Sequence, residues 1–223
     1  MTSAIFKPTS QIISAMNRVY GHMTLAVITS MMVSLLVSSS PALMTFFFTG
    51  SMKWIVIFAP LVAIFAIGAK MHRVNYAKAQ LMLHGFAALM GLSFATIFIV
   101  YTLGSIFTAF IGAAVLFGTM SLYGYVTKKD LKSMGQFMFV GLIAIIIVSI
   151  INLFIGSTSM QMVISALAVI IFLGLTAYDT QKIRKIVSMS GDTRSQEVAG
   201  ALTLYLDFIN LFIALLHLFG GRR

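Results

Sequence analysis

Two carboxylate residues lie inside stretches of this sequence that are otherwise apolar. Asp179 lies near the polar end of the run SALAVIIFLGLTAYDTQKIRKI, and Asp207 lies well inside the run GALTLYLDFINLFIALLHLF. The chain has five acidic residues, and these are the two that long apolar runs flank. An ionisable side chain inside a membrane span costs roughly 2.5–3.5 kcal/mol on insertion scales, and by default it marks a functional site. We therefore take Asp179 and Asp207 as the candidate site.

The chemistry of such a pair follows from its surroundings. Two carboxyl groups that lie close together in a low dielectric cannot both ionise cheaply, so we expect them to share a proton near neutral pH. Loss of that proton would leave two anions that repel one another or recruit a cation. Carboxylate oxygens suit Ca²⁺, although two of them fall short of its usual roughly 6–8 ligands. A weak, transient Ca²⁺ site fits conduction better than storage, because a conducted ion must also leave. The pair thus indicates a proton-sensitive cation pathway.

Polar and small residues accompany each aspartate. At about 100° per residue, Asn210 and His217 share a helix face with Asp207, and Thr176 shares a face with Asp179. This pattern predicts that the two segments face each other or line a narrow water-filled path. The residues that we expect to support the pair are Thr176, Tyr178, Tyr205, Asn210 and His217.

A purely structural interpretation competes with this one. Asp179 precedes Lys182, Arg184 and Lys185, so it could be an interfacial residue paired with those bases. Asp207 could form only a structural hydrogen bond, for example to Asn210. The histidines near the ends of the apolar segments are typical of the membrane interface.

The composition excludes several classes of protein. Hydrophobic residues make up 60% of the chain and charged residues 9%, whereas soluble domains carry roughly 25% charged residues. There are no cysteines, which excludes disulfides, thiolate metal sites and a cysteine nucleophile. We expect no cofactor. The net charge of +10 comes from short basic runs beside apolar segments, a distribution typical of topology signals and contact with anionic lipid rather than nucleic acid.

The apolar runs predict an all-α membrane protein with seven transmembrane helices, since each span needs ~20 apolar residues. We expect a cytoplasmic N-terminal tail over residues 1–21 without a cleavable signal peptide, a single integral membrane domain over 22–219, and a basic C-terminal tail over 220–223. The predicted spans cover residues 22–40, 54–70, 84–101, 105–126, 136–154, 160–180 and 200–219.

The basic residues predict the orientation of these spans. Twelve of the 15 lysines and arginines fall in the N-terminal tail and in the loops after the second, fourth and sixth spans. By the positive-inside rule these segments, including the N-terminus, are cytoplasmic. Asp179 and Asp207 would then lie at the same depth, near the cytoplasmic third of the bilayer. A re-entrant last segment would place Arg222 and Arg223 inside as well, so the charges favour re-entry while the segment length favours a full span.

Several motifs carry a resemblance to a known family. These are AYDTQKI over residues 177–183, LYLDFINLF over 204–212, FGTMSLYGYVTKKDL over 117–131, the Gly91-Leu-Ser stretch and Asn152-Leu-Phe. From about residue 20 to 219 the chain resembles the Bax inhibitor-1 family, in its bacterial branch. The resemblance implies a bacterial inner-membrane protein whose last helix is central, surrounded by the other six.

The resemblance also implies an activity. Members of this family act as pH-sensitive calcium leaks, in which two aspartates on the last two helices form a hydrogen-bonded gate, and Asp179 and Asp207 match those positions. A basic residue at the end of the second helix bonds an aspartate and favours opening, and Lys70 or Arg73 is the nearest match here. Many relatives carry Arg where this chain has His217, a departure that could alter the local response to pH. The role of eukaryotic members in suppressing cell death is not carried over to this chain.

Other functions compete with a Ca²⁺ leak. The family is similar to a bacterial inner-membrane protein that binds and modulates a membrane-bound protease, so a regulatory, partner-binding protein is the alternative. Intramembrane aspartyl proteases also use two aspartates on neighbouring helices, but they carry a Gly-x-Gly-Asp segment where this chain has Leu204-Tyr-Leu-Asp207. We therefore expect no enzymatic activity. A proton-coupled carrier is disfavoured because no paired broken helices are visible in the sequence.

Overall fold

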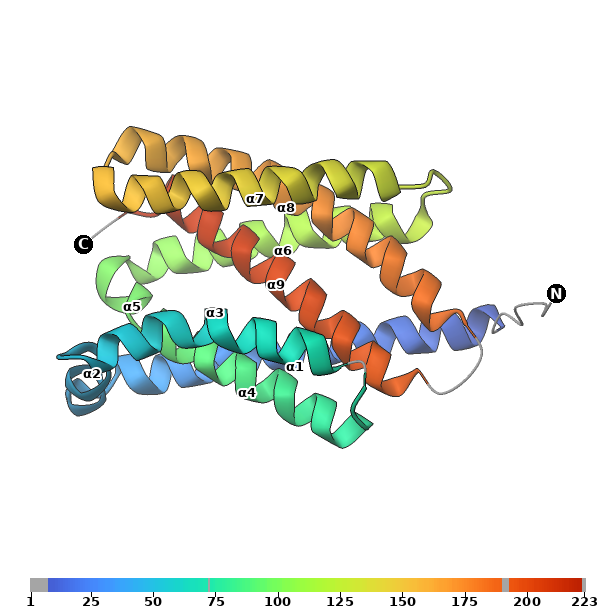
Figure 1. Ribbon diagram of the computed structural model, residues 1–223, viewed down its shortest axis with the longest axis horizontal. Helices are drawn as coiled ribbons and strands as arrows, with labels where there is room; N and C mark the ends of the chain where they lie inside the picture. The colour runs from blue at the N-terminus through green and yellow to red at the C-terminus, as the bar shows by residue number, and fades with distance from the viewer. Residues whose placement is uncertain (1–7, 72, 190–192, 222–223) are drawn as a thin grey trace. The chain divides into compact units, whose positions relative to one another are not determined.

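The computed structural model describes residues 8–71, 73–189 and 193–221, and in these ranges the chain is helical, with no β-strand (Figure 1). Six helical stretches are long and apolar enough to cross a membrane, or seven if the bent pair α2 and α3 forms one span. This confirms the prediction of an all-α membrane protein. The helices are α1 (Thr9–Ser38), α2 (Pro41–Phe48), α3 (Met52–Met71), α4 (Tyr76–Phe94), α5 (Ile97–Val100), α6 (Leu103–Val126), α7 (Lys132–Ile155), α8 (Thr158–Val187) and α9 (Arg194–Phe219).

Each predicted span coincides with a helix, but several helices extend beyond the predicted limits. α1 begins at Thr9, so it includes residues 9–21, which the sequence analysis assigned to a tail. Its polar residues are accommodated because Arg18 finds a partner within the protein, Glu197 of α9. α9 likewise begins at Arg194 rather than at residue 200.

A short helix, α2, occupies a stretch that the sequence analysis left outside the spans. Ser40 accepts a hydrogen bond from the Leu43 backbone N–H, and Pro41 fills the first helical position, where a missing N–H is tolerated. Gly50, with a φ of 59°, makes the turn between α2 and α3, a conformation that glycine adopts without steric cost. The two helices are bent by 77° relative to each other.

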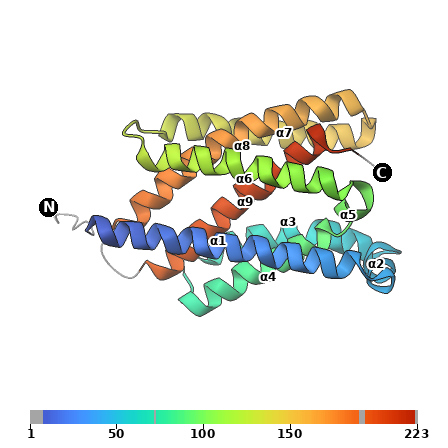
Figure 2. The ribbon, with the colours of Figure 1, turned by 180° about the vertical axis from the view of Figure 1, so that it is seen from behind.

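The chain forms two compact units. The first contains α1 to α5, the end of α8 and α9 up to Tyr205. Within it α1 packs against α4, and α4 against α3, as both views of the ribbon show (Figures 1 and 2). α1 and α4 approach very closely at Gly91, where a Cβ atom would collide with the carbonyl oxygen of Ser30. Such small residues let helix backbones touch in lipid, where apolar burial does not drive association.

The second unit contains α6, α7, α8 up to Arg184, and α9 from Leu206 onward. α7 and α8 lie side by side in both views (Figures 1 and 2). α6 and α9 pack through aromatic rings at right angles: Phe208 lies 5.4 Å from Phe110 and 5.7 Å from Phe117, centroid to centroid. Offset and edge-to-face geometries are the favourable ones for aromatic pairs, so this cluster fixes the helix segment that follows Asp207.

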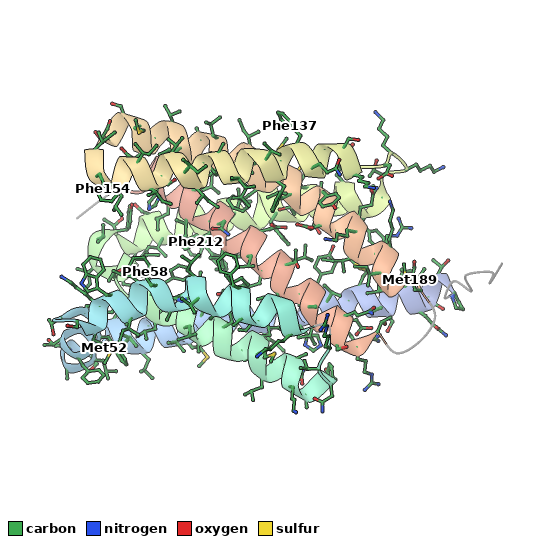
Figure 3. All side chains as sticks on the ribbon, viewed as in Figure 1. Met52, Phe58, Phe137, Phe154, Met189 and Phe212 are labelled. Atoms are coloured by element: carbon green, nitrogen blue, oxygen red, sulfur yellow. The ribbon has the colours of Figure 1, made fainter. Side chains whose placement is uncertain are left out.

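α9 is the most enclosed of the candidate spans in the described chain. In its most apolar 18-residue window 78% of the residues are buried, against 11% for α7. On α7, Phe137 and Phe154 project away from neighbouring helices, with exposed fractions of 73% and 85% (Figure 3). α7 therefore leaves most of its side chains exposed, as expected for a helix in contact with lipid, whereas most residues of α9 are buried.

Candidate functional site

Asp207 lies on α9 in apolar surroundings. Its side chain is 4% exposed, and its neighbours Leu204, Phe208 and Ile209 are also buried. Within the described residues, its Oδ2 atom has no hydrogen-bond partner. Buried polar atoms are nearly always hydrogen-bonded, so an exception calls for an explanation. Asp207 is therefore a candidate functional carboxyl on grounds independent of any motif.

Asp179 lies on α8 in the same unit as Asp207, and its side chain is half-buried. The two carboxyl groups lie near enough to interact electrostatically. Lys182, one turn further along α8, also acts on Asp179 electrostatically. The structure therefore places the two predicted aspartates in the same unit, within electrostatic reach of each other.

Some of the structural partners considered for this pair have other contacts in the structure. Neither Lys182 nor Arg184 forms an ion pair with Asp179 within 4.0 Å. Arg184 instead donates to the Tyr125 carbonyl oxygen at 2.6 Å and stacks over the Tyr125 ring. Asn210 does not bond Asp207, because its amide donates to the Leu206 carbonyl oxygen of its own helix at 2.7 Å.

The loop between α6 and α7 holds the end of α8 that carries Asp179. Gln181 donates to the Lys129 carbonyl oxygen at 2.8 Å and accepts from the Leu131 N–H at 3.0 Å. The hydroxyls of Thr180 and Ser121 lie 3.0 Å apart. These contacts were not predicted, since a single Gln or Thr at a helix end gives no signal of the loop that it will bind.

Close backbone contacts add to this support. A Cβ atom on Gly124 of α6 would collide with the Ala177 carbonyl oxygen, and one on Gly135 of α7 would collide with the Tyr178 ring. α8 is therefore in close contact with α6 at Ala177 and with α7 at Tyr178, the two residues before Asp179. Tyr178 supports the pair through this packing, and Thr176 bonds the Phe172 carbonyl oxygen of its own helix at 2.7 Å.

The remaining predicted residues lie away from the pair or in the other unit. His217 is ten residues beyond Asp207 on α9, where its Nδ1 lies 3.2 Å from Gln161 Nε2. Lys70 lies in the last turn of α3 and Arg73 follows that helix; both belong to the first unit, whereas the aspartates belong to the second. Their role in opening stays a prediction. The two aspartates do not form a complete metal site: the described residues contain no group of three or more potential metal ligands from His, Asp and Glu.

One charged pair that the sequence analysis missed lies in the first unit. Arg18 of α1 donates from Nε and Nη2 to the two carboxylate oxygens of Glu197, at 2.7 and 2.8 Å. Glu197 is 1% exposed and also accepts from Thr193 Oγ1 at 3.3 Å. The sequence analysis placed Glu197 in a loop, because the helix was predicted to begin only at residue 200. A Thr followed four residues later by Glu, at the start of an apolar run, was the available signal.

These helices define an α-helical integral membrane protein that crosses the bilayer several times and carries a carboxyl pair on its last two helices. The family model "Inhibitor of apoptosis-promoting Bax1" matches residues 13–223. The chain is 37% identical to the inner membrane protein YbhL of Escherichia coli strain K12, over 100% of this chain and 97% of YbhL. It is also 37% identical to a protein of Rickettsia prowazekii (93% and 89% covered) and 36% identical to one of Borreliella burgdorferi (92% and 91%). The chain belongs to the Bax inhibitor-1 family.

Proposed function

We propose that this protein is a pH-sensitive Ca²⁺ leak of the membrane, in which Asp179 and Asp207 form the gate. The observation that carries the proposal is the buried Asp207 oxygen without a hydrogen-bond partner, close to a second carboxyl group. An ionisable group that is expensive to bury and is left without a structural partner is best explained by a role that needs its charge to change.

The proposed gate works through the charge of the pair. When the two carboxyls share one proton, they carry a single negative charge between them and attract a cation only weakly. When the proton leaves, two neighbouring anions repel each other and recruit a cation from water. Two oxygens hold Ca²⁺ weakly, so the ion exchanges with water molecules and passes on rather than remaining bound.

The test is Ca²⁺ entry into proteoliposomes that contain an indicator dye, at several values between about pH 6 and 8 with the same pH on both sides. Wild type is compared with Asp179→Asn and Asp207→Asn. Asn is neutral at every pH, so each variant should lose the pH dependence and show the flux level of wild type at the acidic end. Asp130→Asn is the matched control, because Asp130 is an exposed carboxylate in the loop between α6 and α7.

The outcomes separate the candidate functions. Flux that keeps its pH dependence in both variants would place the gate elsewhere. Correctly folded wild type that passes no Ca²⁺ would reject the leak and favour the alternative proposal, a regulatory membrane protein that binds a partner such as a membrane-bound protease.

We also propose a location and an orientation. A relative that aligns over its nearly full length is an inner membrane protein, and we infer the same bacterial membrane for this chain. Twelve of 15 basic residues on one side support a cytoplasmic N-terminus. Because the natural chain has no cysteine, Lys132→Cys and Lys53→Cys offer a test: a membrane-impermeant thiol reagent added to whole spheroplasts should label the second and spare the first.

A further inference from the structure

We propose that four residues joining α1 to α9, namely Arg18, Glu197, Ser30 and Tyr205, position Asp207 by fixing the depth and rotation of α9. We call these residues the α1–α9 clamp. The inference rests on the proposed function, in that Asp207 is taken as a gate residue. The sequence analysis named Tyr205 among the residues that support the aspartates but none of the other three members, and no member of the clamp contacts the ion in the proposed mechanism.

The first contact of the clamp is the Arg18–Glu197 ion pair. Both oxygens of the carboxylate are engaged, at 2.7 and 2.8 Å, and the carboxylate is 1% exposed. The planar guanidinium matches a carboxylate at two points, which fixes direction as well as distance. Such a pair gives weak net stability, but breaking it leaves a buried charge. Its geometry therefore determines where the first turn of α9 lies on α1.

The second contact is the hydrogen bond between Tyr205 and Ser30. Their hydroxyl oxygens lie 2.6 Å apart, and Ser30 also donates to the Ala87 carbonyl oxygen of α4 at 2.7 Å. The Tyr205 ring is fully buried and meets Phe86 edge to face. Gly91 lets the α4 backbone lie directly against Ser30. Ser30 is therefore held by two helices, so it provides a rigid anchor for the Tyr205 hydroxyl.

The spacing of the two contacts transmits this restraint to Asp207. Glu197 and Tyr205 are eight residues apart, about 12 Å along a helix, and Asp207 follows Tyr205 after about 3 Å. A helix fixed at two points this far apart can neither slide nor turn about its axis without breaking one of them. Asp207 lies within the same helical turn as the second contact, so its position is fixed with that contact.

The experiment measures the accessibility of Asp207 and, separately, Ca²⁺ flux. Dicyclohexylcarbodiimide, an apolar reagent that modifies carboxyl groups in membranes, is added to proteoliposomes, and the rate of Asp207 modification is followed by peptide mass spectrometry. The variants are Arg18→Gln, Tyr205→Phe, and the charge exchange Arg18→Glu with Glu197→Arg. Lys132→Gln is the control, because Lys132 is an exposed basic residue at the start of α7.

We expect Arg18→Gln and Tyr205→Phe each to change the rate of Asp207 modification by roughly 5–10-fold, the size of effect that loss of one such bond supports. Both should shift the pH profile of Ca²⁺ flux. The charge exchange should return both readouts to within about twofold of wild type, since it restores the ion pair. Lys132→Gln should change neither.

Two results would overturn the inference. One is an unchanged modification rate and pH profile in Tyr205→Phe, a variant that keeps the ring and its packing and so remains folded. The other is a charge exchange that folds but stays as altered as Arg18→Gln. If wild type passes no Ca²⁺ while the modification rate still responds to the clamp, the proposed leak fails and the positioning of Asp207 stands. If the Ca²⁺ flux depends on both aspartates but neither the flux nor the modification rate changes in the clamp variants, the proposed leak stands and the positioning role of the clamp fails.

Discussion

Replacing Arg18 with Gln should destabilise the protein by an amount that depends strongly on pH. The substitution leaves Glu197, which is 1% exposed, without its two charged hydrogen bonds. A buried charge that has lost its partner costs about 3–5 kcal/mol. The carboxylate can instead bind a proton, which costs an ordinary glutamate about 3.7 kcal/mol at pH 7. The protein adopts whichever of these two states costs less free energy, so we expect Arg18→Gln to lower the free energy of unfolding by about 3–4 kcal/mol at pH 7.

The pH dependence follows from the second of these responses. Binding a proton becomes cheaper by about 1.4 kcal/mol for each pH unit, so the loss should fall to about 2.3 kcal/mol at pH 6 and about 1 kcal/mol at pH 5. For a chain of this length 1 kcal/mol corresponds to about 2–4 °C in Tm. Arg18→Gln should therefore lower Tm by about 7–14 °C at pH 7 and by about 2–4 °C at pH 5.

The assay is thermal unfolding in detergent micelles, followed by far-ultraviolet circular dichroism at the three pH values. Glu197→Gln added to Arg18→Gln removes the buried charge, so this double variant should lose the pH dependence. Lys132→Gln, an exposed basic residue, should behave as wild type. A Tm decrease of equal size at pH 5 and pH 7 would refute the reasoning, because it would mean that Arg18 contributes through the packing of its aliphatic stem and not through the charge of Glu197.

Two further predictions concern the supports of Asp179. Gly124→Ala should destabilise the protein by about 1–3 kcal/mol, because the new Cβ would collide with the Ala177 carbonyl oxygen. Gly118→Ala on the same helix has open space around its Cβ and should be neutral or slightly stabilising. Chemical denaturation measures the stability of both variants, and a Gly118→Ala variant less stable than Gly124→Ala would contradict the prediction. Gln181→Ala should release the loop between α6 and α7, which Gln181 holds by two hydrogen bonds, so trypsin should cut at the loop lysines faster than in wild type. Equal cleavage rates would mean that the loop is held by other contacts.

The membrane spans and the aspartate pair could be predicted because both leave local signals. A run of ~20 apolar residues is needed to cross a bilayer and is visible without any knowledge of neighbours. A carboxylate inside such a run is rare enough to be noticed on its own. In the predicted topology the loop between the two segments returns to the same side, and this is why the sequence predicts a similar depth for both aspartates.

The Arg18–Glu197 ion pair of the clamp could not be predicted because its signals are not local. Arg18 and Glu197 are 179 positions apart, and each lies in a polar stretch that reads as a tail or a loop. The start of α1 was missed for the same reason. Residues 9–21 form a helix whose polar side chains, such as Arg18, bind partners elsewhere in the fold, and the sequence of the segment gives no sign of those partners. α2 was missed although Ser40 and Pro41 form a recognisable helix start, because its eight residues are too few to give a periodic pattern.

The enclosure of α9 has a consequence for how the protein is made. Helices enter the membrane in the order in which they are synthesised, and α9 follows the other eight described helices. Until it arrives, Arg18 and Ser30 on α1 lack the partners that they have in the finished protein. α9 itself carries Glu197 and Asp207. It should insert more readily beside α1, α4 and α6, which are already in the membrane, than into lipid alone. A chain halted before residue 194 would therefore leave Arg18 without its carboxylate partner and Ser30 without the Tyr205 hydroxyl.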